Sequence, residues 1–281
     1  GQIGPLMALQ DQVDAITFNL LVAQHYGAFR QRYIIGWLAT DEEEKAIATL
    51  VGQHPEAIIV AGIDQTPHAR RLLQHSGVPV IQTFELADEP IDINVGLSQS
   101  QAAYEAVRYL IEQGHTRIGF IAARLDARAR ARMAGHARAM EEAGLPIDNR
   151  IATTERSSSV AAGTAMISTL LDRGAELDAI FCCDDNLALG ALFECQRRGI
   201  AVPEQMSLIG FNDLEFAACA CPSLSSVATP RYEMGRLSAE ILMRIIETGE
   251  RPANPKIDVG FSIRKRQSTA RRGANMATAA D

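Results

Sequence analysis

Two polar side chains end an apolar run in the second half of the chain. The run Ser207–Phe211 reads as a buried strand, and Asn212 and Asp213 come directly after it. In open parallel α/β sheets, ligands bind beyond the carboxyl ends of the strands, so polar residues there are candidate ligand contacts. Asn and Asp also favour plain turns, because their side chains hydrogen-bond to nearby backbone groups. Taken alone, the pair is compatible with a ligand site and with a turn.

A series of arginines is the second candidate for ligand chemistry. An arginine side chain can donate two parallel hydrogen bonds to a carboxylate or to a vicinal diol. The same pattern is typical of a solvated basic helix start, and the sequence favours neither interpretation. The members of the series are Arg124, Arg128, Arg130, Arg132 and Arg138.

Patterns that would indicate catalysis or a metal centre are missing from the sequence. The six histidines have no metal-ligand spacing, and Cys219-x-Cys221 has no second pair at the usual distance. The chain has no phosphate-binding loop and no Gly-x-Ser-x-Gly motif. We therefore predict no catalytic residues, no metal and no cofactor, and we expect that the protein is not an enzyme.

Composition indicates a soluble protein that does not bind nucleic acid through this chain alone. The 281 residues are enough for two lobes, and the formal net charge of −7 is unsuited to phosphate neutralisation. No apolar run is long enough to span a membrane, and the start of the chain shows no secretory signal. The five cysteines do not resemble a disulfide framework, which favours a reducing cytoplasm.

Short apolar runs alternate with longer amphipathic runs along the whole chain, which predicts an α/β fold with largely parallel sheets. The expected strands are 3–9, 32–39, 56–62, 78–84, 91–96, 116–123, 178–183, 206–211 and 256–269. The expected helices are 14–26, 42–53, 66–77, 100–115, 131–145, 159–174, 186–200 and 230–249. The pattern restarts near Gly114, so we predict two lobes. Residues 1–114 form the first and 115–229 with 253–269 form the second. The helix from Pro230 follows the second half but could pack on the first, and the resemblance described below implies that 230–252 belong to the first lobe; 270–281 form a disordered tail.

Several phrases of the chain resemble the lactose-repressor (LacI/GalR) family of bacterial transcriptional regulators. They are GHTRIGFIAA, RARMAGHARAMEEAGL and VPEQMSLIGFND, in that order and at that spacing. The phrase EPIDINVGLSQ resembles the gluconate-repressor branch. The resemblance implies a two-lobed, periplasmic-binding-protein-like (type I) fold and a homodimer. It also implies a sugar or sugar-acid effector in the interlobe cleft, which controls DNA binding. Operator DNA would be bound only through a headpiece that is not part of this chain.

The resemblance also implies which residues contact the effector. Arg132 matches the arginine that grips hydroxyls or carboxylates, Asp184 stands where the family often has Asn, and Asn212 stands where many members have Asp. Ser98 and Gln99 follow the strand 91–96 at a further contact position. We expect Asp185 to cap the following helix and Asp213 to serve the turn, so that Asn212 faces the ligand.

The first-lobe wall departs from the family pattern. Gln10 and Gln12 are the candidate contacts there, in a segment that reads ALQDQVDA in place of the usual Pro-Ser-x-x-Asn-x-x-Phe. Together Arg132 and Asn212 favour an anionic ligand, so we expect a polyhydroxy acid such as gluconate ahead of neutral hexoses. Family analogy also places helices 14–26 and 67–75 in the dimer interface, together with parts of the second lobe. The alternative function is a periplasmic sugar-binding protein of a transport system, which shares this fold.

Overall fold

The computed structural model describes residues 33–35, 40–147 and 149–269. The chain divides into two compact units, the first made of Gly1–Leu97 with Pro230–Gly260 and the second of Ser98–Thr229 with Phe261–Asp281. These limits differ from the predicted lobes at two points. The helix after residue 98 groups with the second unit, where it packs on another helix, and residues 256–258 group with the first, where they join its sheet.

Unit 1 contains a parallel sheet with the strand order β1-β2-β3-β4-β10 in the described part of the chain. Its central strands are buried on both faces. β2 is a continuous apolar run, whereas β3 and β4 also bury the polar residues Gln82, Thr83 and Asn94, which have hydrogen-bond partners. The strands are β1 (Tyr33–Ile35), β2 (Ile58–Ala61), β3 (Val80–Glu85), β4 (Ile93–Leu97) and β10 (Lys256–Asp258).

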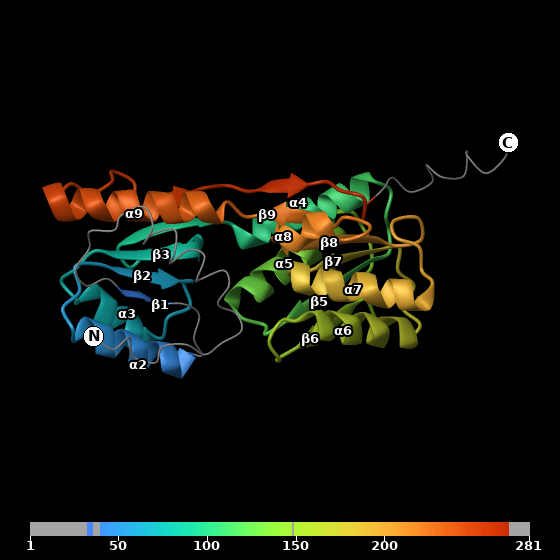
Figure 1. Ribbon diagram of the computed structural model, residues 1–281, viewed down its shortest axis with the longest axis horizontal. Coiled ribbons are helices and arrows are strands. Elements are labelled where there is room, and N and C mark those ends of the chain that lie inside the picture. Colours follow the sequence, from blue (N-terminus) through green and yellow to red (C-terminus); the bar gives the residue numbers. More distant parts are fainter. Residues whose placement is uncertain (1–32, 36–39, 148, 270–281) are drawn as a thin grey trace. The chain divides into compact units, whose positions relative to one another are not determined.

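Helices cover both faces of the unit 1 sheet (Figure 1). α2 (Thr40–Val51) and α3 (Pro67–Gln74) lie over one face, and α9 (Arg231–Thr248) lies over the other. The hydroxyl of Thr66 caps α3 by accepting a hydrogen bond from the backbone N–H of Ala69 at 3.1 Å. Burial of these helix faces against the strands makes the unit 1 core.

Unit 2 contains a larger sheet with the order β11-β9-β8-β7-β5-β6. All of its neighbouring strands are parallel except β11 and β9, which are antiparallel. The strands are β5 (Ile118–Ala123), β6 (Ile151–Thr154), β7 (Ala179–Cys182), β8 (Ser207–Asn212), β9 (Ser225–Ala228) and β11 (Ser262–Arg264). Three fully buried aromatic side chains, Phe120, Phe181 and Phe211, lie on the central strands of this sheet.

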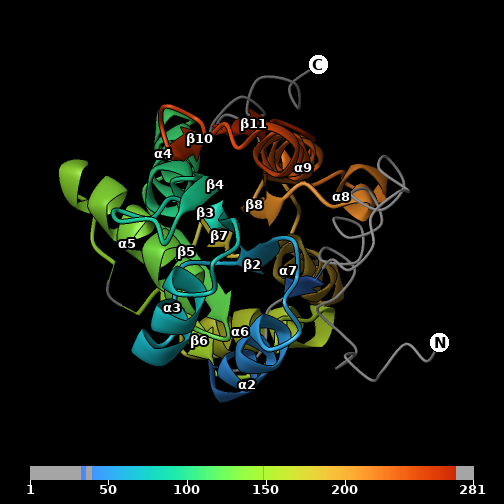
Figure 2. The same cartoon turned by 90° about the vertical axis from the view of Figure 1, so that its left-hand side faces the viewer.

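Two helix pairs enclose the unit 2 sheet. Figure 2 shows α4 (Gln99–Glu112) and α5 (Ala127–Glu142) on one side of the central strands, with α6 (Val160–Asp172) and α7 (Asp185–Arg198) on the other. α8 (Glu215–Cys219) is a short helix between β8 and β9. Within each pair the two helices pack directly against each other, so side chains of α4 and α5 can contact one another.

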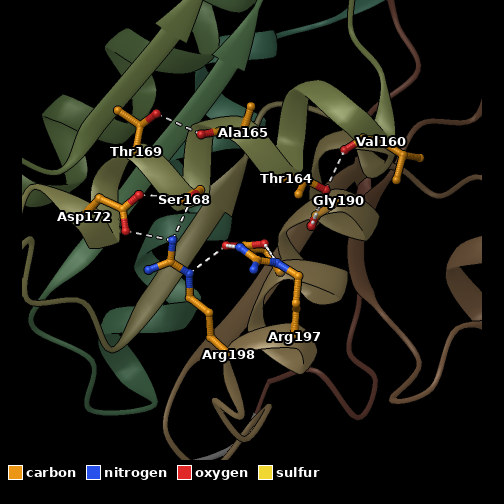
Figure 3. Close-up of polar contacts among 10 residues, drawn as sticks. Val160, Thr164, Ala165, Ser168, Thr169, Asp172, Gly190, Arg197 and Arg198 are labelled. Atoms are coloured by element: carbon orange, nitrogen blue, oxygen red, sulfur yellow. Dashed lines mark hydrogen bonds and ion pairs between the residues drawn. The ribbon is translucent and has the colours of Figure 1, made fainter.

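Polar contacts join α6 to α7 (Figure 3). Arg198 on α7 binds Asp172 at 2.8 Å and the hydroxyl of Ser168 at 2.7 Å, both on α6. The carboxylate of Glu194, which is fully buried, accepts hydrogen bonds from Arg197 and Arg198. The contacts of Arg198 therefore hold α7 against α6.

Several predicted elements need correction. The single strand predicted over 256–269 is two strands, β10 and β11, which belong to different sheets and are separated by Gly260 in a left-handed conformation with φ of 66°. The short elements β6, α8 and β9 were not predicted. The strand 3–9 and the helix 14–26 lie outside the described residues.

Candidate effector-binding site

The carboxyl edge of the unit 2 sheet collects most of the predicted contact residues. β5, β7 and β8 are parallel neighbours, so the residues that follow them meet at one edge. The backbone leaves the strands there with positive φ at four residues that are not glycine, a conformation that L-residues rarely adopt. These are Arg124, Leu125, Asn212 and Asp213. The β-to-helix turns at this edge are consequently sharply bent.

Arg132 is held at this edge by three elements of unit 2. It lies on α5, and its side chain is buried, with 7% of the residue exposed. Its Nε donates a hydrogen bond to Gln99 Oε1 at 2.9 Å, and its Nη1 donates to the carbonyl oxygen of Cys183. The guanidinium carbon lies 3.7 Å from the centroid of the Phe211 ring, a cation–π contact.

The positive charge of Arg132 has no carboxylate partner in an ion pair among the residues that the structure describes. Asp126, at the N-terminus of α5, is paired with Arg128 at 2.7 Å instead. Burial acts to raise the pKa of Asp126, but the charge of Arg128, hydrogen bonds and the weaker effect of Arg132 lower it overall. A buried guanidinium without a counterion is unfavourable unless an anion compensates it. The edge is thus suited to a negatively charged ligand.

Two consecutive carboxylates follow β7, and they have different roles. Asp184 Oδ1 accepts a hydrogen bond from the backbone N–H of Leu187 at 3.1 Å, so Asp184 caps α7. Desolvation raises its pKa above the ordinary value, although hydrogen bonds and the charge of Arg132 act in the opposite direction. The prediction that Asp185 would be the cap is wrong. Asp185 is completely buried and accepts hydrogen bonds at 2.7 Å from the hydroxyl of Ser226 and from the N–H of Leu214.

Asn212 and Asp213 also have different structural roles. Asp213 forms an ion pair with Arg266 at 2.6 Å and a longer one with Arg264 at 3.7 Å. Its backbone N–H donates to the hydroxyl of Ser226. Asp213 therefore anchors the end of β8 to the C-terminal segment. Asn212 is half-buried and has a φ of 102°, which turns the chain at the carboxyl edge.

Ser98 and Gln99 have partners within unit 2. The Ser98 hydroxyl caps α4 by accepting a hydrogen bond from the N–H of Gln101 at 3.1 Å. Gln99 is 3% exposed and faces Arg132. The structure thus brings Gln99 and Arg132 together, 33 residues apart in the sequence. Gln10 and Gln12 lie outside the described residues.

Sequence reasoning missed two parts of this arrangement, the Phe211 ring and the Cys183 carbonyl. Phe211 reads as an ordinary core residue of a strand, and a backbone carbonyl carries no signal in the sequence. Within the described residues, no three His, Cys, Asp or Glu side chains are grouped as metal ligands would be. None of the helices in the described ranges has the length and apolar character of a membrane span.

Comparison with known proteins agrees with this architecture. Residues 107–269 match the family model of a periplasmic binding protein-like domain. The HTH-type transcriptional regulator GntR of Pseudomonas aeruginosa is 38% identical over 230 residues, which cover 82% of this chain and 66% of that protein. The regulator of the same name in Escherichia coli is 31% identical over 259 residues, covering 92% and 74%.

A solved structure shares the fold closely. The transcription regulator GntR from Chromobacterium violaceum superimposes with a TM-score of 0.86 at 31% identity, covering 94% of this chain and 97% of that chain. The present chain spans just under two thirds of the Pseudomonas relative, at 66% of its length. The similarity covers both units and includes the carboxyl edge that carries Arg132. This chain belongs to the lactose-repressor family of transcriptional regulators.

Proposed function

We propose that this chain is the effector-binding core of a ligand-controlled transcriptional regulator. The observation that carries the proposal is Arg132, a buried cation with unused hydrogen-bond donors at the carboxyl edge of a parallel sheet. That edge is where α/β proteins bind small ligands. The related regulators favour this function over that of a transport binding protein. The site binds its ligand and does not transform it. The position of the effector between two lobes, which the family resemblance implies, stays a prediction.

The effector of the proposed regulator is an anionic polyhydroxy compound, with gluconate as the leading candidate. A carboxylate would compensate the buried charge of Arg132, which forms no ion pair with a described carboxylate. Asn212 at the same edge adds an amide, which can donate to ligand oxygens without repelling a negative charge. Asp184 Oδ1 accepts the hydrogen bond that caps α7, and the second carboxylate oxygen of Asp184 is the candidate acceptor for ligand hydroxyls.

Assembly and location follow the same proposal. The regulator acts as a homodimer, in which the predicted interface includes α3 and parts of unit 2. Phe193 on α7 is 49% exposed, and a partner subunit would cover such an aromatic surface residue. All five cysteines, which lie within the described residues, are free thiols, in accord with a cytoplasmic location. Operator DNA is bound by a part of the regulator outside these two units, which together carry a formal net charge of −7.

Calorimetric titration tests the ligand proposal. Gluconate should bind to the protein more tightly than sorbitol, the polyol in which a CH2OH group replaces the carboxylate. Arg132→Ala should weaken gluconate binding by at least about 1.5 kcal/mol, the lower end for a hydrogen bond to a charged group. Equal affinity for the two compounds, or no loss in the variant, would contradict the anionic effector. Sedimentation of a monomer at micromolar concentration would contradict the homodimer.

A further inference from the structure

The hydrogen-bond donors of Arg132 are only partly used by the protein. A guanidinium group has about five N–H bonds, one on Nε and two on each Nη. Gln99 Oε1 takes the Nε donor and the Cys183 carbonyl takes one donor on Nη1. The Cys183 thiol also interacts with this guanidinium. No further oxygen among the described residues accepts a hydrogen bond from Arg132, so donors on Nη1 and Nη2 remain for ligand oxygens. A ligand that uses two nitrogens at once must therefore approach the Nη1–Nη2 end.

The partners of Arg132 also restrict how the group can move. The ring of Phe211 lies against the guanidinium, with 3.7 Å between the guanidinium carbon and the ring centroid. Gln99 is on α4, Cys183 directly follows β7 and Phe211 is on β8, so three separate parts of unit 2 fix the plane of the guanidinium. A preorganised donor group loses little conformational freedom when a ligand binds.

The close approach of α4 and α5 brings Gln99 within hydrogen-bond distance of Arg132. Gly135 lies one helical turn after Arg132 on α5, and a β-carbon added there would be 2.2 Å from the carbonyl oxygen of Ser100 and 2.9 Å from the Tyr104 nitrogen. Only glycine permits the backbone of α5 to lie this near the first turn of α4. The spacing Arg132-x-x-Gly135 thus sets the Arg132–Gln99 hydrogen bond.

Gln99 orients Arg132 without cancelling its charge. An amide oxygen is a neutral acceptor, so the guanidinium keeps its full positive charge for a ligand. A glutamate at the same place would accept the same hydrogen bond and neutralise the group. The amide at position 99 therefore suits a site for an anion, whereas a carboxylate there would suit a neutral ligand.

We propose that Gln99 is a positioning residue for Arg132 and not a ligand contact, and that the site takes a carboxylate end-on, with one oxygen on Nη1 and the other on Nη2. This assignment deepens the proposed function and rests on it for the identity of the ligand. The geometry of Arg132 itself does not depend on that identity, which allows two separate tests.

The first test uses the protein without any ligand. In ¹⁵N NMR spectra, the Arg132 Nε–H resonance, identified by its loss in Arg132→Lys, should exchange slowly with water because Gln99 accepts its proton. Gln99→Leu should shift that resonance and speed its exchange at least severalfold. Gln101→Ala is the matched control, since Gln101 lies on the same helix and its side chain bonds to Glu105 and Arg138 instead. An unchanged Arg132 resonance in Gln99→Leu would overturn the positioning role.

The second test uses gluconate and sorbitol as probes. Gln99→Leu should weaken gluconate binding on the order of tenfold, the usual effect of one hydrogen bond to a charged group. Gln99→Glu keeps the acceptor and should weaken gluconate far more than sorbitol, which a merely structural role would not do. Equal losses for the two probes in Gln99→Glu would overturn the proposal.

The two tests also distinguish this inference from the proposed function. If neither probe binds the unaltered protein, the sugar-acid effector is wrong, and the first test still decides the role of Gln99. If gluconate binding depends on Arg132 but Gln99→Leu binds gluconate as tightly as the unaltered protein, the sugar-acid effector is supported and the positioning role of Gln99 is contradicted.

Discussion

The carboxylate of Asp185 occupies the space that a side chain at Gly210 would need. A β-carbon added to Gly210 would lie 2.2 Å from Asp185 Oδ1. That oxygen also accepts the hydrogen bond from Ser226, and the other accepts from the N–H of Leu214. Asp185 therefore ties α7 to β9 and to the residues after β8, and the glycine of the Ile-Gly-Phe run gives it room.

Gly210→Ala should destabilise the protein. Asp185 has a short, fully buried side chain with two fixed partners, so it cannot move aside without breaking a hydrogen bond. Overpacking of this kind costs about 1–3 kcal/mol in the free energy of unfolding. Equilibrium unfolding in urea measures the cost. Gly52→Ala is the control, because a β-carbon at Gly52 meets its nearest atom at an ordinary 3.4 Å. Equal stability of the two variants would show that Asp185 has room to move.

His136 should make unit 2 sensitive to acid. This residue is completely buried on α5, beside the ring of Phe120 at 5.4 Å, and its Nε2 lies 3.4 Å from the Ile118 carbonyl oxygen. Desolvation lowers the pKa of His136 from 6.5 to about 4. The unfolded chain therefore binds this proton near pH 6.5 and the folded chain only near pH 4. The stability that neutral His136 contributes is complete above pH 6.5 and is lost as the pH falls toward 4.

His136→Phe tests this acid sensitivity. The variant keeps an aromatic ring against Phe120 and removes the titrating group, so its stability should fall less between pH 6.5 and pH 4. The difference should reach roughly 3 kcal/mol, because the pKa of His136 falls from 6.5 to about 4 on folding and one pH unit corresponds to about 1.36 kcal/mol. The variant must be compared with the unaltered protein, because burial raises the pKa of Asp185 to about 7. Asp185 therefore makes the free energy of unfolding rise as the pH falls, in both proteins alike. Parallel stability curves would rule out His136 as the source.

Much of the fold is predictable from the sequence, because buried parallel strands need continuous apolar runs. The runs around Ile58, Ile81, Phe120 and Phe181 all became central strands. β9 has the sequence Ser-Ser-Val-Ala, and both serines are buried through hydrogen bonds that no local pattern indicates. A short strand of this composition is therefore not recognisable from the sequence, although β9 lies between β11 and β8 in the sheet.

The site is predictable only in part. Arg132 was identified through the sequence phrase that contains Gly135. The spacing of these two residues has a physical reason, because a side chain at position 135 would clash with the backbone of α4. The partnership of Arg132 with Gln99 depends on helix packing across 33 residues of sequence, so neither residue alone indicates it. Asp184, and not Asp185 as predicted, caps α7, because adjacent residues at a strand end point in different directions and composition does not distinguish them.

Glu194→Gln should destabilise the α6–α7 pair at neutral pH. Hydrogen bonds from Arg197 outweigh the effect of burial and, together with Arg198, lower the pKa of Glu194 to about 2. Its contribution is present above the ordinary carboxylate pKa and is lost as the pH falls toward 2. We expect a loss of about 1 kcal/mol at pH 7, since the arginines are partly in water.

Urea unfolding across pH checks the Glu194 prediction. The gap between the unaltered protein and Glu194→Gln should shrink between pH 5 and pH 3 if the carboxylate charge is its source. Glu176→Gln is a matched control, because Glu176 forms a 3.2 Å pair with Arg117 but its side chain is 76% exposed. A loss in Glu176→Gln as large as that in Glu194→Gln would show that burial of the carboxylate is unimportant.

Arg132→Lys separates charge from geometry in the proposed effector site. A lysine ammonium keeps the positive charge but has no planar pair of nitrogens and no guanidinium face for Phe211. We expect gluconate to bind on the order of tenfold more weakly than to the unaltered protein, the scale of one charge-assisted hydrogen bond. The preference for gluconate over sorbitol should persist in Arg132→Lys and disappear in Arg132→Ala.

Arg130→Lys provides the control for this experiment, because Arg130 lies two residues earlier on α5, is exposed and donates to the backbone carbonyl of Leu125. Calorimetric titration of all three variants with both compounds gives the comparison. If Arg132→Lys bound gluconate as tightly as the unaltered protein, charge alone would explain recognition and the Nη1–Nη2 geometry would be irrelevant. If Arg130→Lys lost as much as Arg132→Lys, the effect would belong to the basic start of α5 as a whole, because the exposed Arg130 makes none of the three contacts that hold Arg132.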